Sequence, residues 1–581
     1  MQFAKRLRTR RYHEAGVTPM TTAPATTYDA MYLGTAARPW LAYRHPGKPD
    51  AGTALVIVPP FGHEALNAYR SLRALAEAAA QAGLDAWRID LDGTGDSAGD
   101  DRDPDRVRHW LASITATVEA ARAYGATRVI LVGVRLGATL AAQVAADHLI
   151  AIAPVVAGKK WLREMRALQG ALGLPPAPAT AIPFDGDEAL GFAISPQTRE
   201  ALTVLDLEKA AAAPAHVFVI DRDDMPASTK WLDKLRALGS DVTHARIPGY
   251  VEMVMDPHKS EIPTQIIAAV LERAVAWAAG TTRAAATPPV FPRTARFGDV
   301  IEEPVSIAGL AAVVSRPAKQ PRPQRALLIL NAGAVRRVGP NRMFVTIARR
   351  IAADGALVVR ADLPGLGDSQ PAVGDPDRVV YFEAAEPAVS QLVAWCRAAG
   401  ATKVVPAGLC SGGYYALRST LGGDPVAAMI AINPGTPDLA GFQATVDAER
   451  YNQSVRDPEK WKKLLRGGVD MRRLTRSVVT RARELATARV AGLARKLGRP
   501  LAGDLGADLM KLIKRGVTPT YVLCVGDPQL TRFREMVGPM LPKLEQAGLT
   551  CHVIEGPDHT FTPLWSQDVL ADQMAAALRR L

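Results

Sequence analysis

Cysteine is scarce in this chain, and its scarcity excludes two kinds of architecture. The 581 residues include 4 cysteines, at positions 396, 410, 524 and 551. They are not clustered with the spacing of metal ligands, so neither a disulfide scaffold nor a zinc site is expected. We predict no cofactor, and a reducing cytoplasm is the natural location for such a chain.

Long hydrophobic runs are also missing. No uninterrupted stretch of about 18 apolar residues occurs, which predicts a chain without a membrane span. The basic residues near the N-terminus are not followed by an apolar stretch, so they do not have the pattern of a secretory signal. We expect residues 1–27 to form a disordered tail.

Acidic residues are outnumbered by basic ones, and the formal net charge is +12. Residues 438–516 hold most of this excess, with 18 lysines and arginines against 9 acidic residues. No nucleic-acid motif and no interleaved aromatic residues accompany them, so a nucleic-acid partner is not expected. The segment is typical either of a solvated helical face or of a surface for an acidic partner.

What the chain does contain is an internal repeat. Residues 90–97 read DLDGTGDS, and residues 362–369, 272 positions later, read DLPGLGDS. The pentapeptide DPDRV follows each of them. Residues 125–138 (GATRVILVGVRLGA) then match residues 400–413 (GATKVVPAGLCSGG), at an offset of 275. Three blocks in the same order predict a tandem duplication.

Each copy alternates strand-like and helix-like segments. In the first copy we expect a hairpin over 28–45, strands at 54–58, 86–89 and 128–132, and helices at 69–82, 107–124 and after Gly137. In the second copy the corresponding segments are 300–315, 326–330, 344–353, 356–360, 381–399 and 403–407. Continuous apolar strands alternating with helices predict α/β domains with mostly parallel sheets and helices on both faces. The expected domains are 28–279 and 297–581, joined by a proline-rich linker at 280–296, with a helical lid at about 438–516.

A cysteine lies at the centre of a glycine-flanked turn in the second copy. Gly408, Leu409, Cys410, Ser411 and Gly412 follow an apolar, strand-like run, which is the G-x-nucleophile-x-G pattern of a strand-to-helix elbow. The glycines are needed because side chains at their positions would collide with neighbouring backbone in such a strained turn. We predict Cys410 as the nucleophile, with Ser411 or a buried structural thiol as alternatives.

With these residues, both halves resemble the α/β-hydrolase fold, from about Tyr28 to the end of the chain. The block at 362–369 is similar to one in serine-aminopeptidase-like hydrolases. The cysteine elbow resembles those of dienelactone hydrolases, polyester synthases and chain-releasing cyclases of polyketide pathways. The resemblance implies an oxyanion hole made by the backbone N–H of Ser411 and one from the loop after the first buried strand, at Gly333 or Ala334.

The same fold implies a nucleophile, an acid and a histidine in that order along the chain. Asp527 directly follows the strand-like run 521–526, and His559 follows the next such run. His559 would take the proton of Cys410, and Asp527 would orient the imidazole and stabilise its cation. Two alternatives stay open: Asp558 as the acid, and Asp527 as the cap of the turn that follows it.

The first copy lacks this set of residues. Arg135 stands at the centre of its elbow and, being always charged, cannot attack an acyl group. Asp221 remains at the position of the acid, but Met253 stands where the second copy has its histidine. Pro59 and Pro60 remove donors from the corresponding oxyanion loop. We expect a non-catalytic domain used for packing, or an Arg135 that holds a carboxylate or phosphate.

These residues together predict an acyl-transfer enzyme. The expected substrate is an acyl ester or thioester, cleaved through an acyl-enzyme with water as the acceptor, as in a hydrolase or thioesterase. An acyltransferase or chain-releasing cyclase for carrier-bound acyl groups is the alternative, and a non-catalytic binding or scaffold protein is the alternative of another class. The basic lid would gate the site and dock an acidic acyl carrier protein or coenzyme A.

Overall fold

The computed structural model describes residues 28–222, 224–225, 228–320, 323–371, 380–381, 385–435, 490 and 503–581. The predicted tail, the second DPDRV pentapeptide and most of the predicted lid lie outside these residues. No helix in the described part is long and apolar enough to cross a membrane. Nor does that part hold a group of three or more histidine, cysteine or acidic side chains placed to bind a metal ion.

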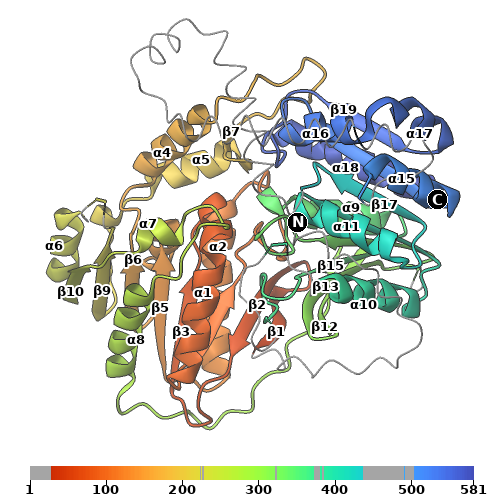
Figure 1. Cartoon of the computed structure of the whole chain (residues 1–581). Coiled ribbons are helices and arrows are strands. Elements are labelled where there is room, and N and C mark those ends of the chain that lie inside the picture. Colours follow the sequence, from red (N-terminus) through yellow and green to blue (C-terminus); the bar gives the residue numbers. More distant parts are fainter. Residues whose placement is uncertain are drawn as a thin grey trace, which may run out of the picture.

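The first half of the chain folds around an eight-stranded sheet (Figure 1). Its order is β1-β2-β4-β3-β5-β6-β9-β10, and it is parallel from β4 to β10, with an antiparallel hairpin at one edge. The strands are β1 (Asp29–Thr35), β2 (Arg38–His45), β3 (Thr53–Val58), β4 (Asp85–Ile89), β5 (Arg128–Val134), β6 (His148–Ile152), β9 (His216–Asp221) and β10 (Asp241–Arg246). The helices and the small hairpin strands are α1 (His63–Gln81), α2 (Arg106–Ala123), α3 (Leu136–Ala141), α4 (Gly158–Ala171), β7 (Asp187–Ala189), β8 (Phe192–Ile194), α5 (Pro196–Val204), α6 (Thr229–Ala237), α7 (Tyr250–Met253) and α8 (Thr264–Ala278).

The second half folds around a nine-stranded sheet whose order is β11-β12-β13-β15-β14-β16-β17-β18-β19. It is parallel from β15 to β19 and, apart from the added edge strand β11, repeats the strand order of the first sheet. The strands are β11 (Ala295–Phe297), β12 (Val300–Ile307), β13 (Leu310–Pro317), β14 (Arg325–Leu330), β15 (Leu357–Ala361), β16 (Lys403–Leu409), β17 (Ala428–Ile432), β18 (Thr518–Cys524) and β19 (Thr550–Ile554). The helices are α9 (Met343–Ala353), α10 (Ala385–Ala398), α11 (Ser411–Gly422), α15 (Leu505–Lys514), α16 (Pro528–Val537), α17 (Leu541–Ala547) and α18 (Leu564–Arg579).

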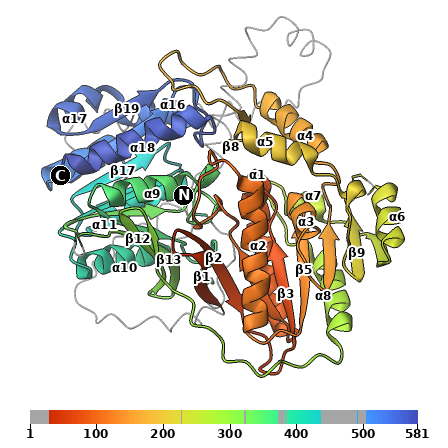
Figure 2. The same ribbon diagram turned by 180° about the vertical axis from the view of Figure 1, so that it is seen from behind.

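The central strands are buried on both faces, which explains their unbroken apolar sequences. In β3, Leu55 and Ile57 pack in one cluster with helix α1, whereas Val56 and Val58 pack in another with helix α2. Successive side chains of a strand point to opposite faces, so a strand covered twice needs apolar residues throughout. Figures 1 and 2 show α1 and α2 on the two opposite faces of this sheet.

The predicted hairpins, strands and helices are largely confirmed, with two differences in the described residues. Helix α1 begins at His63, six residues before the predicted start. The turn at Gly62 (φ +64°) directly precedes its first residue. Tyr381 lies in a bend rather than in helix α10, whose described residues begin at Ala385. The domain boundaries stay a prediction, although β11 begins within the segment predicted as linker.

The two repeated blocks fold into the same hydrogen-bonded turn. In the first, the Ser97 hydroxyl donates to the carbonyl of Asp90 at 2.6 Å and accepts a backbone N–H from β2 at 2.8 Å. In the second, Ser369 donates to the carbonyl of Asp362 at 2.6 Å and accepts a backbone N–H from β13 at 2.9 Å. Two such similar networks are what a tandem duplication predicts, and the duplication itself stays a prediction.

These turns face each other where the two sheets meet. Arg88 of the first domain pairs with Asp368 of the second at 3.0 Å, and Arg360 of the second pairs with Asp96 of the first at 2.5 Å. All four side chains are at most 5% exposed. Because the partners occupy equivalent positions of the two repeats, each domain gives the other the same contact. That is the pattern of a twofold-symmetric interface.

Candidate active site

Cys410 occupies the predicted elbow between β16 and α11. Its backbone is strained, with φ +56° and ψ −115°. A Cβ added at Gly408 would lie 2.5 Å from the carbonyl carbon of Gly412, and one at Gly412 would lie 2.8 Å from the carbonyl oxygen of Leu330. Both glycines are therefore required, and the turn places the cysteine side chain beyond the carboxyl end of the strand.

The structure brings Cys410, His559 and Asp527 together. Nδ1 of His559 lies 2.5 Å from Oδ2 of Asp527, whose side chain is 1% exposed, and the imidazole and the Cys410 thiol are close enough for each to shift the pKa of the other. The loop after β18 provides the carboxylate, and the loop after β19 provides the histidine. Neighbouring parallel strands end at the same edge of the sheet, so residues 117 and 149 positions after Cys410 meet its thiol there.

The charges in this group favour a thiolate and an imidazolium. Burial alone would raise the pKa of Cys410, but the hydrogen bond and charge of His559, with hydrogen bonds from Tyr381 and the backbone of Ser411, lower it. Burial alone would lower the pKa of His559, but its hydrogen bonds to Asp527 and Cys410 raise it well above its ordinary value of 6.5. Both shifts favour the proton on the imidazole over the proton on the sulfur.

The two candidates for the acid, Asp527 and Asp558, make different contacts. Asp527 is both cap and partner, since its Oδ1 accepts the backbone N–H of Gln529 at 2.8 Å while Oδ2 faces the histidine. The carboxylate of Asp558 instead accepts hydrogen bonds from Thr560 and from the backbone and hydroxyl of Thr562, at 2.7 to 3.0 Å. Asp558 therefore shapes the turn beside the histidine.

The hydroxyl of Ser411 is buried and hydrogen-bonded to backbone groups, which is the environment of a structural residue and not of a nucleophile. It is 1% exposed, its hydroxyl accepts the backbone N–H of Gly333 at 2.9 Å, and it donates to the carbonyl of Asn331 at 3.3 Å. The Gly333 N–H is thus occupied, which differs from the prediction that it is available to an oxyanion. No hydrogen bond within the described residues uses the N–H of Ala332 or Ala334, so both are available as donors.

Two further residues of the site were missed by sequence reasoning. The hydroxyl of Tyr381 lies 3.7 Å from Sγ of Cys410. The side chain of Asn433 donates to the carbonyl of His559 at 2.9 Å and accepts the N–H of Cys524 at 2.9 Å, which ties the histidine loop to the sheet. A polar residue directly after a buried strand could have indicated Asn433, whereas no local pattern marks Tyr381.

Replacing Tyr381 with phenylalanine should make the Cys410 thiolate harder to form. Burial and the nearby cysteine raise the pKa of the Tyr381 hydroxyl, so it stays protonated and donates to sulfur. A hydrogen bond worth about 1 kcal/mol corresponds to a roughly fivefold effect. We expect the rising limb of the pH profile of Cys410 alkylation to move to higher pH, with a roughly fivefold slower rate on that limb. An unchanged profile would show that the contact does not stabilise the thiolate.

The corresponding site of the first domain is filled by its own side chains. Arg135 has the same elbow conformation (φ +53°, ψ −122°). Its guanidinium donates to Glu64 at 2.8 Å and to Glu164 at 2.6 Å. Asp221 pairs with His244 at 2.6 Å, and Met253 is buried in the core. Two carboxylates already neutralise Arg135, so the structure favours the packing role over capture of an anion.

Replacing Arg135 with methionine should destabilise the protein by about 3 kcal/mol, because it leaves Glu64 buried without its charge partner. Both side chains are 5% exposed. The matched double variant, Arg135→Met with Glu64→Gln, should recover most of this loss. Urea unfolding of the full chain measures both effects. If the single variant is as stable as the wild type, the ion pair has no structural role.

Residues 327–573 match the Alpha/beta hydrolase family. The comparison with curated proteins gave no match. Among solved structures, the chain is similar to the ferulic-acid-bound Est1E of Butyrivibrio proteoclasticus, with 18% identity, a TM-score of 0.32 and coverage of 43% of this chain and 97% of that one. It is also similar to a dienelactone hydrolase of Anabaena variabilis (11%, TM-score 0.29, 48% and 96%) and to a hyperthermophilic esterase of Pyrobaculum calidifontis (15%, TM-score 0.29, 49% and 86%).

The family match spans the elbow, the carboxylate and the histidine, and it supports hydrolase activity for this half of the chain. A family match does not identify the nucleophile or the substrate, which have to be inferred from the residues of the site. With its mostly parallel sheet, its strand-to-helix elbow and this match, the segment 327–573 belongs to the α/β-hydrolase superfamily.

Proposed function

We propose that the second domain cleaves an acyl ester or thioester through an acyl-enzyme on Cys410, as a hydrolase or thioesterase. One observation carries the proposal: the cysteine at the strained elbow shares a site with His559, which lowers the pKa of the thiol, and Nδ1 of this histidine lies 2.5 Å from the buried carboxylate of Asp527. A buried structural cysteine stays a neutral thiol and does not require a charged partner. Cys396, for comparison, is fully buried, and burial raises its pKa to about 12.

The reaction follows from these positions. The thiolate of Cys410 attacks the carbonyl carbon of the substrate. The resulting oxyanion accepts hydrogen bonds from the backbone N–H of Ser411 and from backbone N–H groups of the loop after β14. The C–O or C–S bond of the substrate breaks as His559 gives its proton to the leaving alcohol or thiol. Water, deprotonated by His559, then attacks the acyl-enzyme, and the thiolate leaves. Asp527 keeps the imidazole in the tautomer and orientation that both steps need.

A cavity beside the nucleophile suits an apolar acyl group. Its volume is about 180 Å³, and a Cβ added at Gly435, which lines it, would lie 3.3 Å from Sγ of Cys410. Most of the other lining side chains are large and apolar or aromatic: Tyr414, Leu417, Leu421, Leu505, Tyr521, Phe533 and Met536. The wall also includes four polar side chains, those of Arg418, Asp508, Gln529 and Arg532, so the cavity suits a largely apolar acyl chain.

A series of p-nitrophenyl esters, from acetate to decanoate, tests this proposal in the full chain. We expect hydrolysis with an initial burst and a mass increase equal to the acyl group, located on Cys410. In the His559→Ala variant at pH 9, where a thiol ionises without help, the adduct should persist because deacylation has lost its base. If no ester labels Cys410 in preference to the other three cysteines, the scaffold hypothesis replaces the enzyme.

The acceptor is tested in the same assay. If the adduct forms but is released only when an added alcohol, amine or thiol is present, the protein is an acyltransferase. Docking of an acidic acyl carrier protein or coenzyme A on the basic segment is part of this proposal, and residues 436–502, apart from Val490, lie outside the described structure.

A further inference from the structure

The first domain reaches the loop that carries the available oxyanion donors. This loop, residues 331–337, follows β14 and is called the oxyanion loop below. Its own domain holds it from one side, since Asp362 Oδ1 accepts the side-chain amide of Asn331 at 3.0 Å and the backbone N–H of Arg337 at 2.6 Å. These bonds fix the two ends of the loop.

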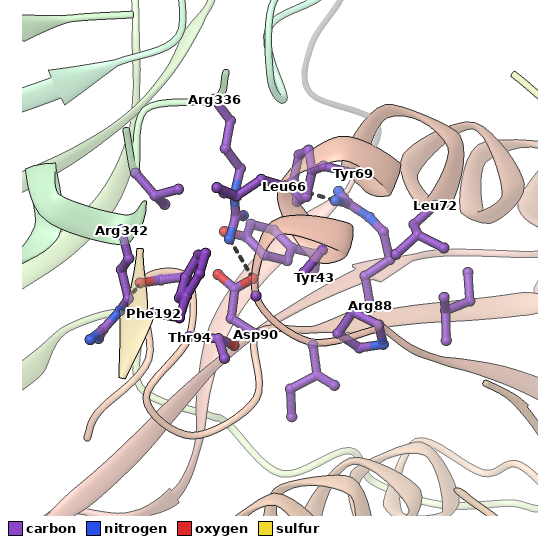
Figure 3. Close-up of a pocket in the computed structure, with 17 residues that line it drawn as sticks. Tyr43, Leu66, Tyr69, Leu72, Arg88, Asp90, Thr94, Phe192, Arg336 and Arg342 are labelled. Atoms are coloured by element: carbon purple, nitrogen blue, oxygen red, sulfur yellow. Dashed lines mark hydrogen bonds and ion pairs between the residues drawn. The ribbon is translucent and has the colours of Figure 1, made fainter. Parts of the chain in front are cut away.

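Side chains of the first domain hold the same loop from the other side. Arg336 donates to Asp90 at 2.7 Å and lies 4.0 Å from the centre of the Tyr69 ring, and Figure 3 shows it reaching between these two residues. The neighbouring Arg337 donates to the hydroxyl of Tyr43 at 2.6 Å. Both arginines are buried, with 6% and 2% exposure, so water does not compete for these contacts.

The middle of the oxyanion loop is also in contact with the first domain. A Cβ added at Gly333 would lie 2.4 Å from Nε2 of His258, which follows α7. Gly333 has φ +57°, a conformation that favours glycine. The residue between the two available donors, Ala332 and Ala334, is therefore packed directly against a side chain from the other repeat.

We propose that the first domain, which has no nucleophile of its own, positions the oxyanion loop of the second domain for acyl transfer. This inference rests on the proposed function of Cys410. Donors stabilise a tetrahedral intermediate only when they lie about 2.7–3.1 Å from its oxyanion, and a displacement of about 1 Å costs a large part of the rate. Asp90 and Tyr43 are thus positioning residues, which act through Arg336 and Arg337.

Two reactions of the same cysteine separate positioning from general structure. Acylation by p-nitrophenyl butyrate needs the oxyanion donors, whereas alkylation by iodoacetamide needs only the thiolate. We expect Asp90→Asn to lower kcat/KM for the ester by about 10-fold or more, and the milder Tyr43→Phe by about 3-fold, while both alkylate at rates within about 2-fold of wild type. The matched control is Arg73→Met, which removes a hydrogen bond from α1 to the Gly367 carbonyl, across the same interface but outside the loop. It should leave both rates unchanged.

Each outcome decides between the readings. If ester cleavage by Asp90→Asn and Tyr43→Phe equals that of an active wild type, the positioning role is wrong. It is also wrong if acylation and alkylation fall together in Tyr43→Phe, or if Arg73→Met lowers ester cleavage as much, because the interface then acts only through stability. A wild type that alkylates at Cys410 but is never acylated would overturn the proposed function, and this inference with it.

Discussion

Cys410→Ala is expected to lower kcat/KM for ester hydrolysis by at least about 10⁴-fold and to abolish the acyl adduct. The alanine leaves the fold intact, because the elbow strain resides in the backbone and the side chain becomes smaller. What is lost is the thiol whose pKa His559 lowers. Intact-protein mass spectrometry and steady-state kinetics measure the two effects.

Cys410→Ser keeps a side chain of similar size and changes its acidity. A hydroxyl is far less acidic than a thiol, so the pairing that lowers the pKa of Cys410 would no longer produce an anion. We expect a residual activity about 10²- to 10³-fold below that of wild type. Cys551→Ala is the matched control: this cysteine is half-buried, and burial raises its pKa to about 11, so its loss should change nothing. Activity above about one percent in Cys410→Ala would end the nucleophile hypothesis.

The second large effect is expected from Asp527→Asn, which should lower kcat by about 10³- to 10⁴-fold. The asparagine oxygen still accepts the N–H of Gln529, so the cap of α16 survives. What disappears is the negative charge that raises the pKa of His559. The imidazolium then loses its proton at lower pH and no longer stabilises the thiolate, so the rising limb of the alkylation profile should move to higher pH. A stopped-flow ester assay and the pH dependence of alkylation measure both changes.

Asp504→Asn is the matched control for this substitution. Asp504 is the buried cap of α15 and accepts the N–H of Ala507 at 3.0 Å, but it is not among the groups that shift the pKa of His559. The same chemical change there should leave kcat within about twofold. If both variants lose activity equally, Asp527 acts through the stability of the helix start. If neither does, His559 works without a carboxylate partner.

The sequence alone determined the order of elements and the main candidates for chemistry. Strands such as β3 and β14 are buried on both faces, and this burial requires unbroken apolar runs that are visible in the sequence. The elbow was visible because a strained turn admits only glycine at Gly408 and Gly412. Asp527 and His559 were found because each lies a few residues after a strand-like run late in the chain, β18 and β19.

Only the tertiary structure decided which groups touch. Tyr381 precedes Cys410 by 29 residues, and the hydroxyl of Ser411 meets the N–H of Gly333 across 78 residues. Contacts at such separations depend on how helices and loops pack, and no local period records them. The pairs that join the domains are more distant still, at 246 residues for Arg336 with Asp90.

The first domain shows this division most clearly. Its sequence determined what it lacks, because an arginine at the elbow and a methionine in place of the histidine cannot perform acyl transfer. The sequence did not determine what it provides. Asp90 opens the first repeated block and Tyr43 lies in the first hairpin, but neither sequence context indicates a contact with the oxyanion loop. These contacts exist only because two similar domains pack face to face. A side chain acquires such a role from the surface buried against it, which is a property of the assembled fold.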